Sequence, residues 1–291
     1  MKRSFLILLC AMALPQAWSQ ATTDANVFRV NARLVEVYAT VRDHDGRYLD
    51  FLPKERFEIR DNGEPQPVAA FESNAERLSC AVLLDTTGSM TEMLPVVKNS
   101  VVRMIDALRD EDSIAVYSFT TALNRLQDFT ADKAAAKQAV LRTRAGGATA
   151  LFDAISQLAH EIESQSGKKA IVVFTDGDDN ASLLNARAAV QRAKKSGVPV
   201  YAIAEGEALS KKELLNELKD IAETTGAQSY EARKSSDIAR IFQEITADLQ
   251  HTYMLAYHPP PASGQRWRTI ELIVTGLKGA KIRAKQGYVP E

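Results

Sequence analysis

From residue 78 onward, short apolar runs alternate with amphipathic helical patterns, and this alternation constrains the fold most. The runs at 78–84, 113–119 and 170–175 are almost continuously apolar, as expected for strands buried on both faces. Between the first two runs, a helix expected over 91–109 has four apolar residues on one face: Val97, Val101, Met104 and Leu108. The pattern predicts an α/β domain over 78–250, with a doubly wound, mostly parallel sheet flanked by helices.

The other elements expected in this domain continue the alternation. They are an edge strand at 122–129, strands at 199–204 and 227–230, and helices at 132–143, 150–165, 183–196, 211–225 and 235–250. In open α/β sheets, ligands bind at the carboxyl ends of the strands. We therefore expect the functional site in the loops that follow the strands.

Two segments outside this domain have the period of β-strands. In the segment 26–76, one strand face is formed by Val35, Val37, Ala39 and Val41. In the segment 251–291, another apolar face is formed by Leu255, Tyr257, Ile270, Leu272 and Val274. Each segment alone has too few strands for a stable sheet. We therefore expect the two segments to pair into one small antiparallel β unit, with the α/β domain inserted between them.

The first nineteen residues have the pattern of a targeting segment. Lys2 and Arg3 precede an apolar run at 5–14, and the small residues Ala17 and Ser19 follow. This pattern predicts a secretory signal peptide over 1–19, because the run is too short to span a bilayer comfortably. We expect a secreted, periplasmic or cell-envelope protein with no transmembrane span after cleavage.

Charge and cysteine content exclude several kinds of partner and site. With 36 basic and 37 acidic residues, the chain has a formal net charge of -1 and no general attraction to nucleic acid. Cys80 is the only cysteine after residue 19, and its apolar run predicts a small buried side chain rather than a reactive thiol. The four histidines share no metal-ligand spacing, so no zinc site is expected.

Three loops at expected strand ends or helix starts concentrate short oxygen-bearing side chains. The first is Asp85-Thr86-Thr87-Gly88-Ser89, the second is Gly146-Gly147-Ala148-Thr149, and the third is Thr175-Asp176-Gly177-Asp178-Asp179-Asn180. Residues at positions 85, 87 and 89 of an extended turn project to one side. We interpret Asp178 and Asp179 as a solvated turn.

Carboxylates and hydroxyls without imidazole or thiolate are ligands for a hard divalent cation such as Mg²⁺, or alternatively Mn²⁺ or Ca²⁺. Three hydroxyls and two carboxylates would leave one place in a six-oxygen shell for an incoming group. The candidate metal residues are Asp85, Thr87, Ser89, Thr149 and Asp176.

These residues resemble a von Willebrand factor type A (VWA) domain with a metal-ion-dependent adhesion site. The family's Asp-x-Ser-x-Ser element matches Asp85, Thr87 and Ser89, with a threonine at 87 where serine is usual; its distal threonine and aspartate match Thr149 and Asp176. The resemblance covers about residues 78–250. The chain also resembles, on weaker sequence, secreted bacterial VWA-related proteins that have a short β segment on each side of the domain.

The resemblance implies a function in binding rather than catalysis. Family members bind a protein partner whose Asp or Glu side chain completes the shell of the ion, and the domain itself performs no reaction. The hydroxyls are then direct ligands, whereas the acids act partly through water.

Two other interpretations remain open from the sequence. The element at Asp85 also resembles that of haloacid-dehalogenase-like phosphatases, in which Asp85 would be the nucleophile, Lys168 or Lys169 would neutralise phosphate charge and Asp176 would hold Mg²⁺. Position 87, however, lacks the second aspartate of such enzymes. Alternatively, the chain is a scaffold in which the site only supports the fold.

Overall fold

The computed structural model describes residues 34–73, 77–177, 179–261 and 267–290. All elements below belong to the compact unit formed by residues 33–291. The predicted signal peptide over 1–19 lies outside the described residues.

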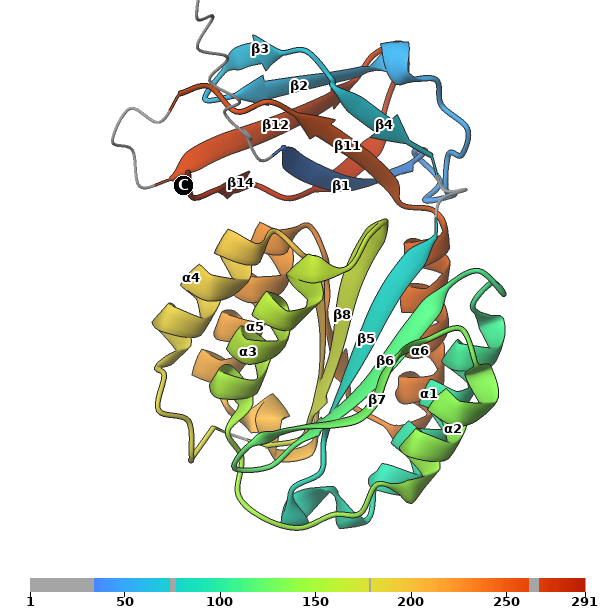
Figure 1. The fold of residues 1–291 in the computed structure, drawn as a ribbon, viewed down its shortest axis with the longest axis vertical. Coiled ribbons are helices and arrows are strands. Elements are labelled where there is room, and N and C mark those ends of the chain that lie inside the picture. Colours follow the sequence, from blue (N-terminus) through green and yellow to red (C-terminus); the bar gives the residue numbers. More distant parts are fainter. Residues whose placement is uncertain (1–33, 74–76, 178, 262–266, 291) are drawn as a thin grey trace, which may run out of the picture. The chain divides into compact units, whose positions relative to one another are not determined.

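A six-stranded central sheet has the order β10-β9-β8-β5-β6-β7. Its strands are β5 (Leu78–Asp85), β6 (Ser113–Phe119), β7 (Leu123–Thr130), β8 (Lys168–Thr175), β9 (Val200–Glu205) and β10 (Ser229–Ala232). Every neighbouring pair is parallel except β6 and β7, which are antiparallel. The mostly parallel sheet predicted from the sequence is thus confirmed (Figure 1).

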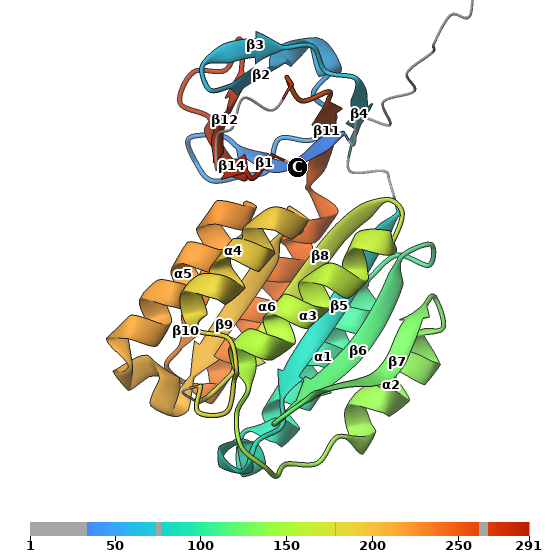
Figure 2. The same ribbon diagram turned by 60° about the vertical axis from the view of Figure 1, so that its left-hand side comes forward.

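Helices cover both faces of this sheet (Figures 1 and 2). They are α1 (Leu94–Ala107), α2 (Lys133–Arg142), α3 (Leu151–Glu161), α4 (Ala186–Ser196), α5 (Lys212–Thr225) and α6 (Ser235–Gln250). Because side chains alternate along a strand, Val82 and Leu84 of β5 join a core with α1, α2 and α6. Ala81 and Leu83 join the opposite core with α3, α4 and α5.

The helix expected over 91–109 begins later than the sequence pattern predicts. Residues Gly88–Thr91 form a 3₁₀ helix, η2, in which Thr91 Oγ1 donates a hydrogen bond to the Gly88 carbonyl oxygen at 2.7 Å. α1 then starts at Leu94 with Pro95 in its first turn, where the missing proline N–H has no cost. The turn at Gly88–Thr91 therefore holds Ser89 outside the regular helix.

The N- and C-terminal segments pair into two antiparallel sheets of four strands. Their orders are β13-β1-β11-β4 and β14-β12-β2-β3. The strands are β1 (Val35–Arg42), β2 (Phe57–Asp61), β3 (Glu64–Gln66), β4 (Ala70–Glu72), β11 (Tyr253–Tyr257), β12 (Arg268–Val274), β13 (Lys281–Ala284) and β14 (Gly287–Tyr288). The expected pairing appears as Val37 opposite Leu255 and Ile59 opposite Leu272.

One hydrophobic core joins these two sheets. It contains both predicted apolar faces, with Val35, Val37, Ala39 and Val41 from β1 and Leu255, Tyr257, Ile270, Leu272 and Val274 from β11 and β12. Within the β unit, the fully buried Asp61 carboxylate accepts hydrogen bonds from Tyr257 Oη, Tyr288 Oη and Arg268 Nε at 2.6 to 2.9 Å. Its charge is therefore compensated as a buried carboxylate requires.

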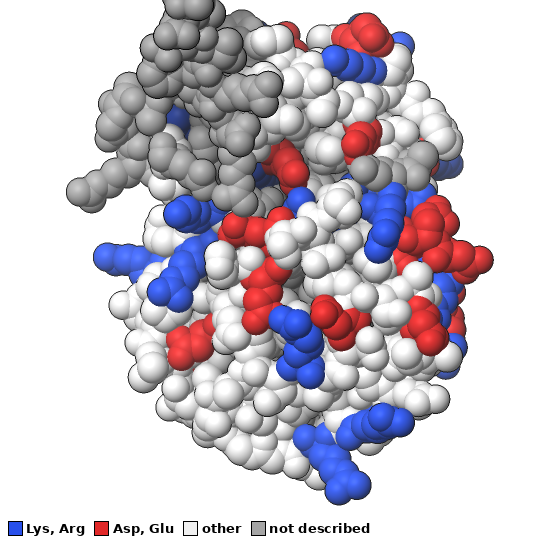
Figure 3. All heavy atoms as spheres, in the orientation of Figure 1, with Lys and Arg blue, Asp and Glu red and all other residues white. Residues whose placement is uncertain are grey.

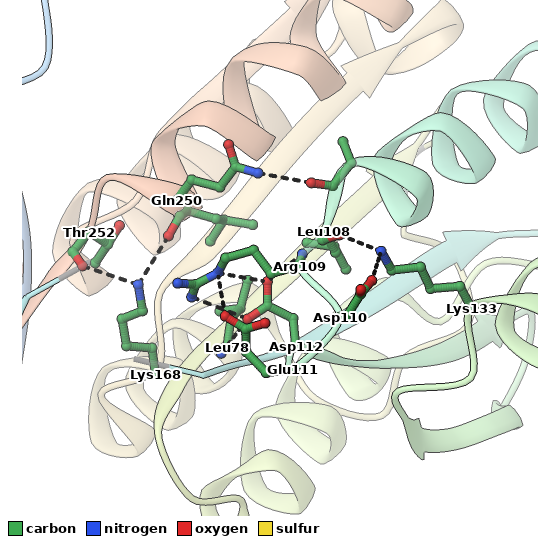
Figure 4. Close-up of polar contacts among 12 residues, drawn as sticks. Leu78, Leu108, Arg109, Asp110, Glu111, Asp112, Lys133, Lys168, Gln250 and Thr252 are labelled. Carbon is green, nitrogen blue, oxygen red and sulfur yellow. Dashed lines mark hydrogen bonds and ion pairs between the residues drawn. The ribbon is translucent and has the colours of Figure 1, made fainter. Parts of the chain in front are cut away.

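Buried polar residues tie the start of the central sheet to the segment that leaves α6. Lys168 Nζ donates to the carbonyl oxygens of Leu249 and Thr252 at 3.5 and 3.3 Å (Figure 4). The Asp112 carboxylate accepts a hydrogen bond from the Leu78 backbone N–H at 2.9 Å and from the Arg109 side chain. These contacts fix the edge of the sheet opposite the predicted site.

Two further expectations concern Cys80 and membrane spans. Cys80 is fully buried, which confirms its expected role, and burial raises the pKa of its thiol to about 12. Among the described residues, no helix is long and apolar enough to cross a bilayer.

Candidate metal centre

All five candidate residues lie at the carboxyl edge of the central sheet. Asp85 is the last residue of β5, and Thr87 and Ser89 follow it in the turn before α1. Thr149 precedes α3 by two residues, and Asp176 directly follows β8. β5 and β8 are hydrogen-bonded neighbours, so the first and third loops start side by side.

A chain of short contacts connects the β5 loop to the β8 loop. Thr87 Oγ1 donates to Asp85 Oδ1 at 2.7 Å, and its own oxygen is 3.1 Å from Ser89 Oγ. Ser89 Oγ in turn donates to Asp176 Oδ1 at 2.9 Å. Four of the five predicted residues are thus joined by direct contacts between side-chain oxygens.

Thr149 reaches the same place from the second loop. A Cβ built on Gly177 would lie 3.7 Å from Thr149 Oγ1 and 3.9 Å from Ser89 Oγ. Both hydroxyls therefore lie around one point beside Gly177. The structure brings all five predicted residues together, although their assignment as metal ligands remains a prediction.

The glycine pair before Thr149 lets the second loop approach the first. Gly146 N–H donates to the Thr86 carbonyl oxygen at 2.8 Å. Gly147 has a φ of +94°, and a Cβ there would lie 3.0 Å from Thr120 Cβ. Both the backbone conformation and the available space therefore favour glycine at 147.

Burial changes the proton affinity of both carboxylates. Asp85 is 0% exposed and Asp176 is 5% exposed. Desolvation raises the pKa of Asp85 despite hydrogen bonds from Thr87 and Thr175. It also raises the pKa of Asp176 to about 6; the hydrogen bond from Ser89 opposes this rise, and the negative charge of Asp85 adds to it. Two close, buried acids disfavour the doubly charged state, so a bound cation would suit this pair.

The donor set fits a hard cation on chemical grounds. Its five side chains offer only oxygen atoms, three of them in neutral hydroxyls, as Mg²⁺, Mn²⁺ and Ca²⁺ prefer. Among the described residues, no group of three or more His, Cys, Asp or Glu side chains could hold a metal ion. A cation at this point would therefore need the threonine and serine hydroxyls as ligands beside the two carboxylates.

Sequence reasoning missed several residues that support the site. Thr175 Oγ1 donates to Asp85 Oδ2 at 2.7 Å. Asn180 Oδ1 accepts from the Thr149 N–H at 2.9 Å, and the N–H groups of Asn180 and Ala181 both donate to the Thr149 carbonyl oxygen at 3.0 Å. Thr175 and Asn180 belong to the third polar loop identified in the sequence, but residue spacing does not indicate that their hydrogen-bond partners are Asp85 and Thr149.

The interpretation of Asp179 as a solvated turn residue is wrong. Its Oδ2 accepts a hydrogen bond from the Phe152 N–H at 2.9 Å, and its Oδ1 accepts one from the Ser182 N–H at 3.0 Å. Asp179 therefore supplies the cap that the first turn of α3 needs, a role that depends on contacts across 27 residues. Asp178 lies outside the described residues.

The lysines required by the phosphatase interpretation are far from Asp85. In the β5–β8 register, Lys168 is opposite Leu78, seven residues before Asp85, which corresponds to about 23 Å along a strand. Lys168 Nζ binds backbone carbonyls at that distant edge, and Lys169 pairs with Glu36 at 3.1 Å. Neither lysine can neutralise a phosphate bound at Asp85.

The fold is a doubly wound α/β sheet, and hydroxyl and carboxylate side chains converge at the carboxyl ends of its strands. This combination is typical of one class of α/β domain. The model of the von Willebrand factor type A domain matches residues 80–244. The match covers more than half of the chain, so the chain belongs to the von Willebrand factor type A domain family. No curated protein matches it by sequence.

Solved structures of low sequence identity share this fold. A von Willebrand factor type A protein from Catenulispora acidiphila superposes with a TM-score of 0.54 at 18% identity, covering 90% of this chain and 75% of that one. Proximal thread matrix protein 1 from the mussel byssus gives 0.53 at 19% identity, over 64% and 49% of the two chains. The vWF domain of the pili tip protein Mfa5 from Porphyromonas gingivalis gives 0.50 at 14% identity, over 59% and 94%.

Proposed function

We propose that this protein is a metal-dependent, non-enzymatic protein-binding module of the cell envelope or the extracellular space. The domain family supports a role in protein interaction. The observation that carries the metal proposal is the convergence of five oxygen-bearing side chains, from three loops, at one edge of the sheet. The basic and then apolar start of the sequence supports export.

In this proposal, the hydroxyls of Thr87, Ser89 and Thr149 bind Mg²⁺ or a similar ion directly. Asp85 and Asp176 supply the negative charge and orient the hydroxyls with which they are hydrogen-bonded. When bound, the ion supplies a positive centre that an Asp or Glu side chain of a partner protein can approach. Neutral hydroxyl ligands leave much of the ionic charge available to that carboxylate.

Titration calorimetry of residues 20–291 with Mg²⁺ and with Mn²⁺ tests the metal proposal. We expect saturable binding to the wild type and none to the double variant Thr149→Ala, Asp176→Ala. The matched control is the double variant Thr275→Ala, Asp220→Ala. It alters an exposed threonine of the β unit and an exposed aspartate of α5, and it should bind the ions like the wild type. Equal binding by all three proteins, or none by any, would favour the scaffold interpretation.

Partner binding requires a separate measurement. Immobilised wild-type protein is exposed to a native envelope or medium fraction, with Mg²⁺ in one arm and a chelator in the other. The expected result is a partner that is retained only with Mg²⁺ and is absent from the double variant. Retention that is unaffected by the chelator contradicts metal dependence even if calorimetry detects an ion.

A further inference from the structure

Leu183 is a fully exposed apolar side chain in the loop that joins β8 to α4. It is 97% exposed, compared with 76% for Phe51 and 56% for Leu141. Single exposed leucines are ordinary on protein surfaces. The position of Leu183 is informative for two reasons: hydrogen bonds fix the backbone of its loop, and the loop contacts the candidate metal centre.

Hydrogen bonds fix the backbone on which Leu183 stands. The N–H groups of Leu183 and Leu184 donate to the two carboxylate oxygens of Asp153, at 2.8 and 2.9 Å. Asp153 lies in the first turn of α3, and Ser182 N–H donates to Asp179 Oδ1. The side chain is therefore presented to solvent by an ordered backbone, so a partner that covers it would not need to order the loop first.

The same loop contacts the candidate metal centre. Asn180 and Ala181 donate to the carbonyl oxygen of Thr149, and Leu183 follows Ala181 by two residues. Two residues of extended chain span about 7 Å at most. Leu183 thus lies beside the second loop of the site, within the reach of any segment that brings a carboxylate to Thr149.

The residues next to Leu183 in the sequence carry no charge. Residues 180–186 contain no lysine, arginine, aspartate or glutamate. The carboxylates that contact this segment are those of Asp153 and Asp179, which accept its backbone hydrogen bonds. On the face displayed in Figure 3, the lower end of the α/β domain is mostly uncharged on the left and carries Lys or Arg side chains on the right. An apolar partner group matches the exposed leucine side chain itself, and the neighbouring Asp153 carboxylate already has the N–H groups of Leu183 and Leu184 as partners.

We propose that Leu183 is the apolar contact of the same binding surface and accepts a leucine, isoleucine, methionine or phenylalanine side chain of the partner. This inference rests on the proposed function. At about 3.3 to 3.6 Å per extended residue, the partner's apolar residue stands two to four positions from its acidic residue. Leu183 thereby adds sequence preference to a metal centre that by itself recognises only a carboxylate.

A displayed peptide library tests this preference without a known partner. The library has a fixed central Glu flanked by four random residues on each side, is selected on Mg²⁺-saturated protein and is eluted with a chelator. We expect the wild type to enrich apolar residues two to four positions from the Glu. Leu183→Ser should lose this enrichment while its calorimetric Mg²⁺ binding stays unchanged, and Leu183→Met should restore it.

Affinities of the enriched peptides complete the test. Burial of one leucine side chain corresponds to about a tenfold gain in affinity or more, so Leu183→Ser should weaken these peptides by at least about tenfold. Leu141→Ser, which removes an exposed leucine from α2, is the control and should leave both affinity and enrichment unchanged.

The two levels of the proposal fail differently. If Leu183→Ser yields the same peptides at the same affinity as the wild type, the inference about Leu183 is wrong although the metal-dependent site stands. If chelator-eluted peptides are absent from the wild-type selection, or are identical after selection on the Thr149→Ala, Asp176→Ala variant, the proposed function itself fails.

Discussion

The carboxylate of Asp248 connects α6 to several strands. It permits a quantitative test of how the β unit and the α/β domain are coupled. It is 0% exposed. Tyr201 Oη donates to it at 2.6 Å, Tyr48 Oη at 3.0 Å and Arg42 Nη2 at 3.2 Å. Arg283 Nη2 is a fourth donor. These donors come from β1, β9, β13 and the loop after β1, so one side chain joins the β unit to the α/β domain.

Replacing Asp248 with asparagine removes the charge and turns one acceptor into a donor. Loss of one partner of a buried ion pair costs about 3 to 5 kcal/mol. The side chains of Arg42 and Arg283 are 34% and 24% exposed, and water can therefore solvate them in part. We expect a loss of about 3 kcal/mol in the free energy of unfolding for Asp248→Asn.

Tyr201→Phe isolates one of the four hydrogen bonds. A hydrogen bond to a charged group contributes about 1.5 to 3 kcal/mol, and the other three donors remain in this variant. The double variant should lose less than the sum of the two single losses, by at least about 1 kcal/mol, because both changes remove the same Tyr201–Asp248 contact.

Urea denaturation followed by two probes measures these quantities. Trp267 is the only tryptophan in residues 20–291, and Lys194 Nζ of α4 lies 5.4 Å from the centroid of its ring. Its fluorescence therefore reports on the β unit and on the contact of that unit with α4, whereas ellipticity at helical wavelengths reports on the α/β domain. We expect coincident transitions in the wild type and separated ones in Asp248→Asn. A loss below about 1 kcal/mol with coincident transitions would refute the claim that this carboxylate couples the two.

Three further predictions concern buried lysines, the glycine loop and the metal centre. Burial lowers the pKa of Lys168 and Lys285 to about 8, below their value of about 10.5 in an unfolded chain. The folded state therefore disfavours protonation of these lysines, which destabilises it. This destabilisation is complete below pH 8 and disappears as the pH rises towards 10.5. Stability measured by urea denaturation from pH 7.5 to 10 should therefore contain a rising contribution that is smaller in Lys168→Met; an unchanged slope argues against it. Gly147→Ala should cost about 1 to 3 kcal/mol in thermal or urea unfolding, because Gly147 has a positive φ and an added Cβ would contact Thr120; a neutral effect would show that the loop relaxes. Thr149→Val keeps the shape of the side chain but should abolish calorimetric Mg²⁺ binding, whereas Thr149→Ser should retain it; binding by the valine variant would exclude the hydroxyl as a ligand.

The sequence was sufficient for the architecture because the relevant forces act locally or through simple periodicity. The apolar run of β5 and the helical spacing of Val97 and Val101 required burial on particular faces, and the structure places them there. Boundaries were less certain where local hydrogen bonds compete with helix formation. The turn over Gly88–Thr91 delayed α1 to Leu94 although the apolar pattern alone was compatible with an earlier start.

The residues that support the site could not be predicted in the same way. Asp179 caps α3 and Asn180 holds Thr149 through contacts between loops that are about thirty residues apart. Such contacts depend on the three-dimensional approach of two loops, which no periodicity encodes. Asp248 and its four donors are a similar case, since the partners come from positions 42, 48, 201 and 283.

The hydrogen bonds of Asp85 bear on how the site would hold an ion. Its Oδ1 accepts from the side chain and the backbone of Thr87, and its Oδ2 accepts from Thr175 Oγ1. Both carboxylate oxygens are thus occupied by protein donors, and the side chain is fully buried. Asp85 is therefore suited to fix the orientation of Thr87, while Ser89 and Thr149, whose hydroxyls lie around the point beside Gly177, are better placed as direct ligands. In the proposed site, this division would place the charge of Asp85 behind the hydroxyls, where it would attract a cation without using the positions that a partner carboxylate needs.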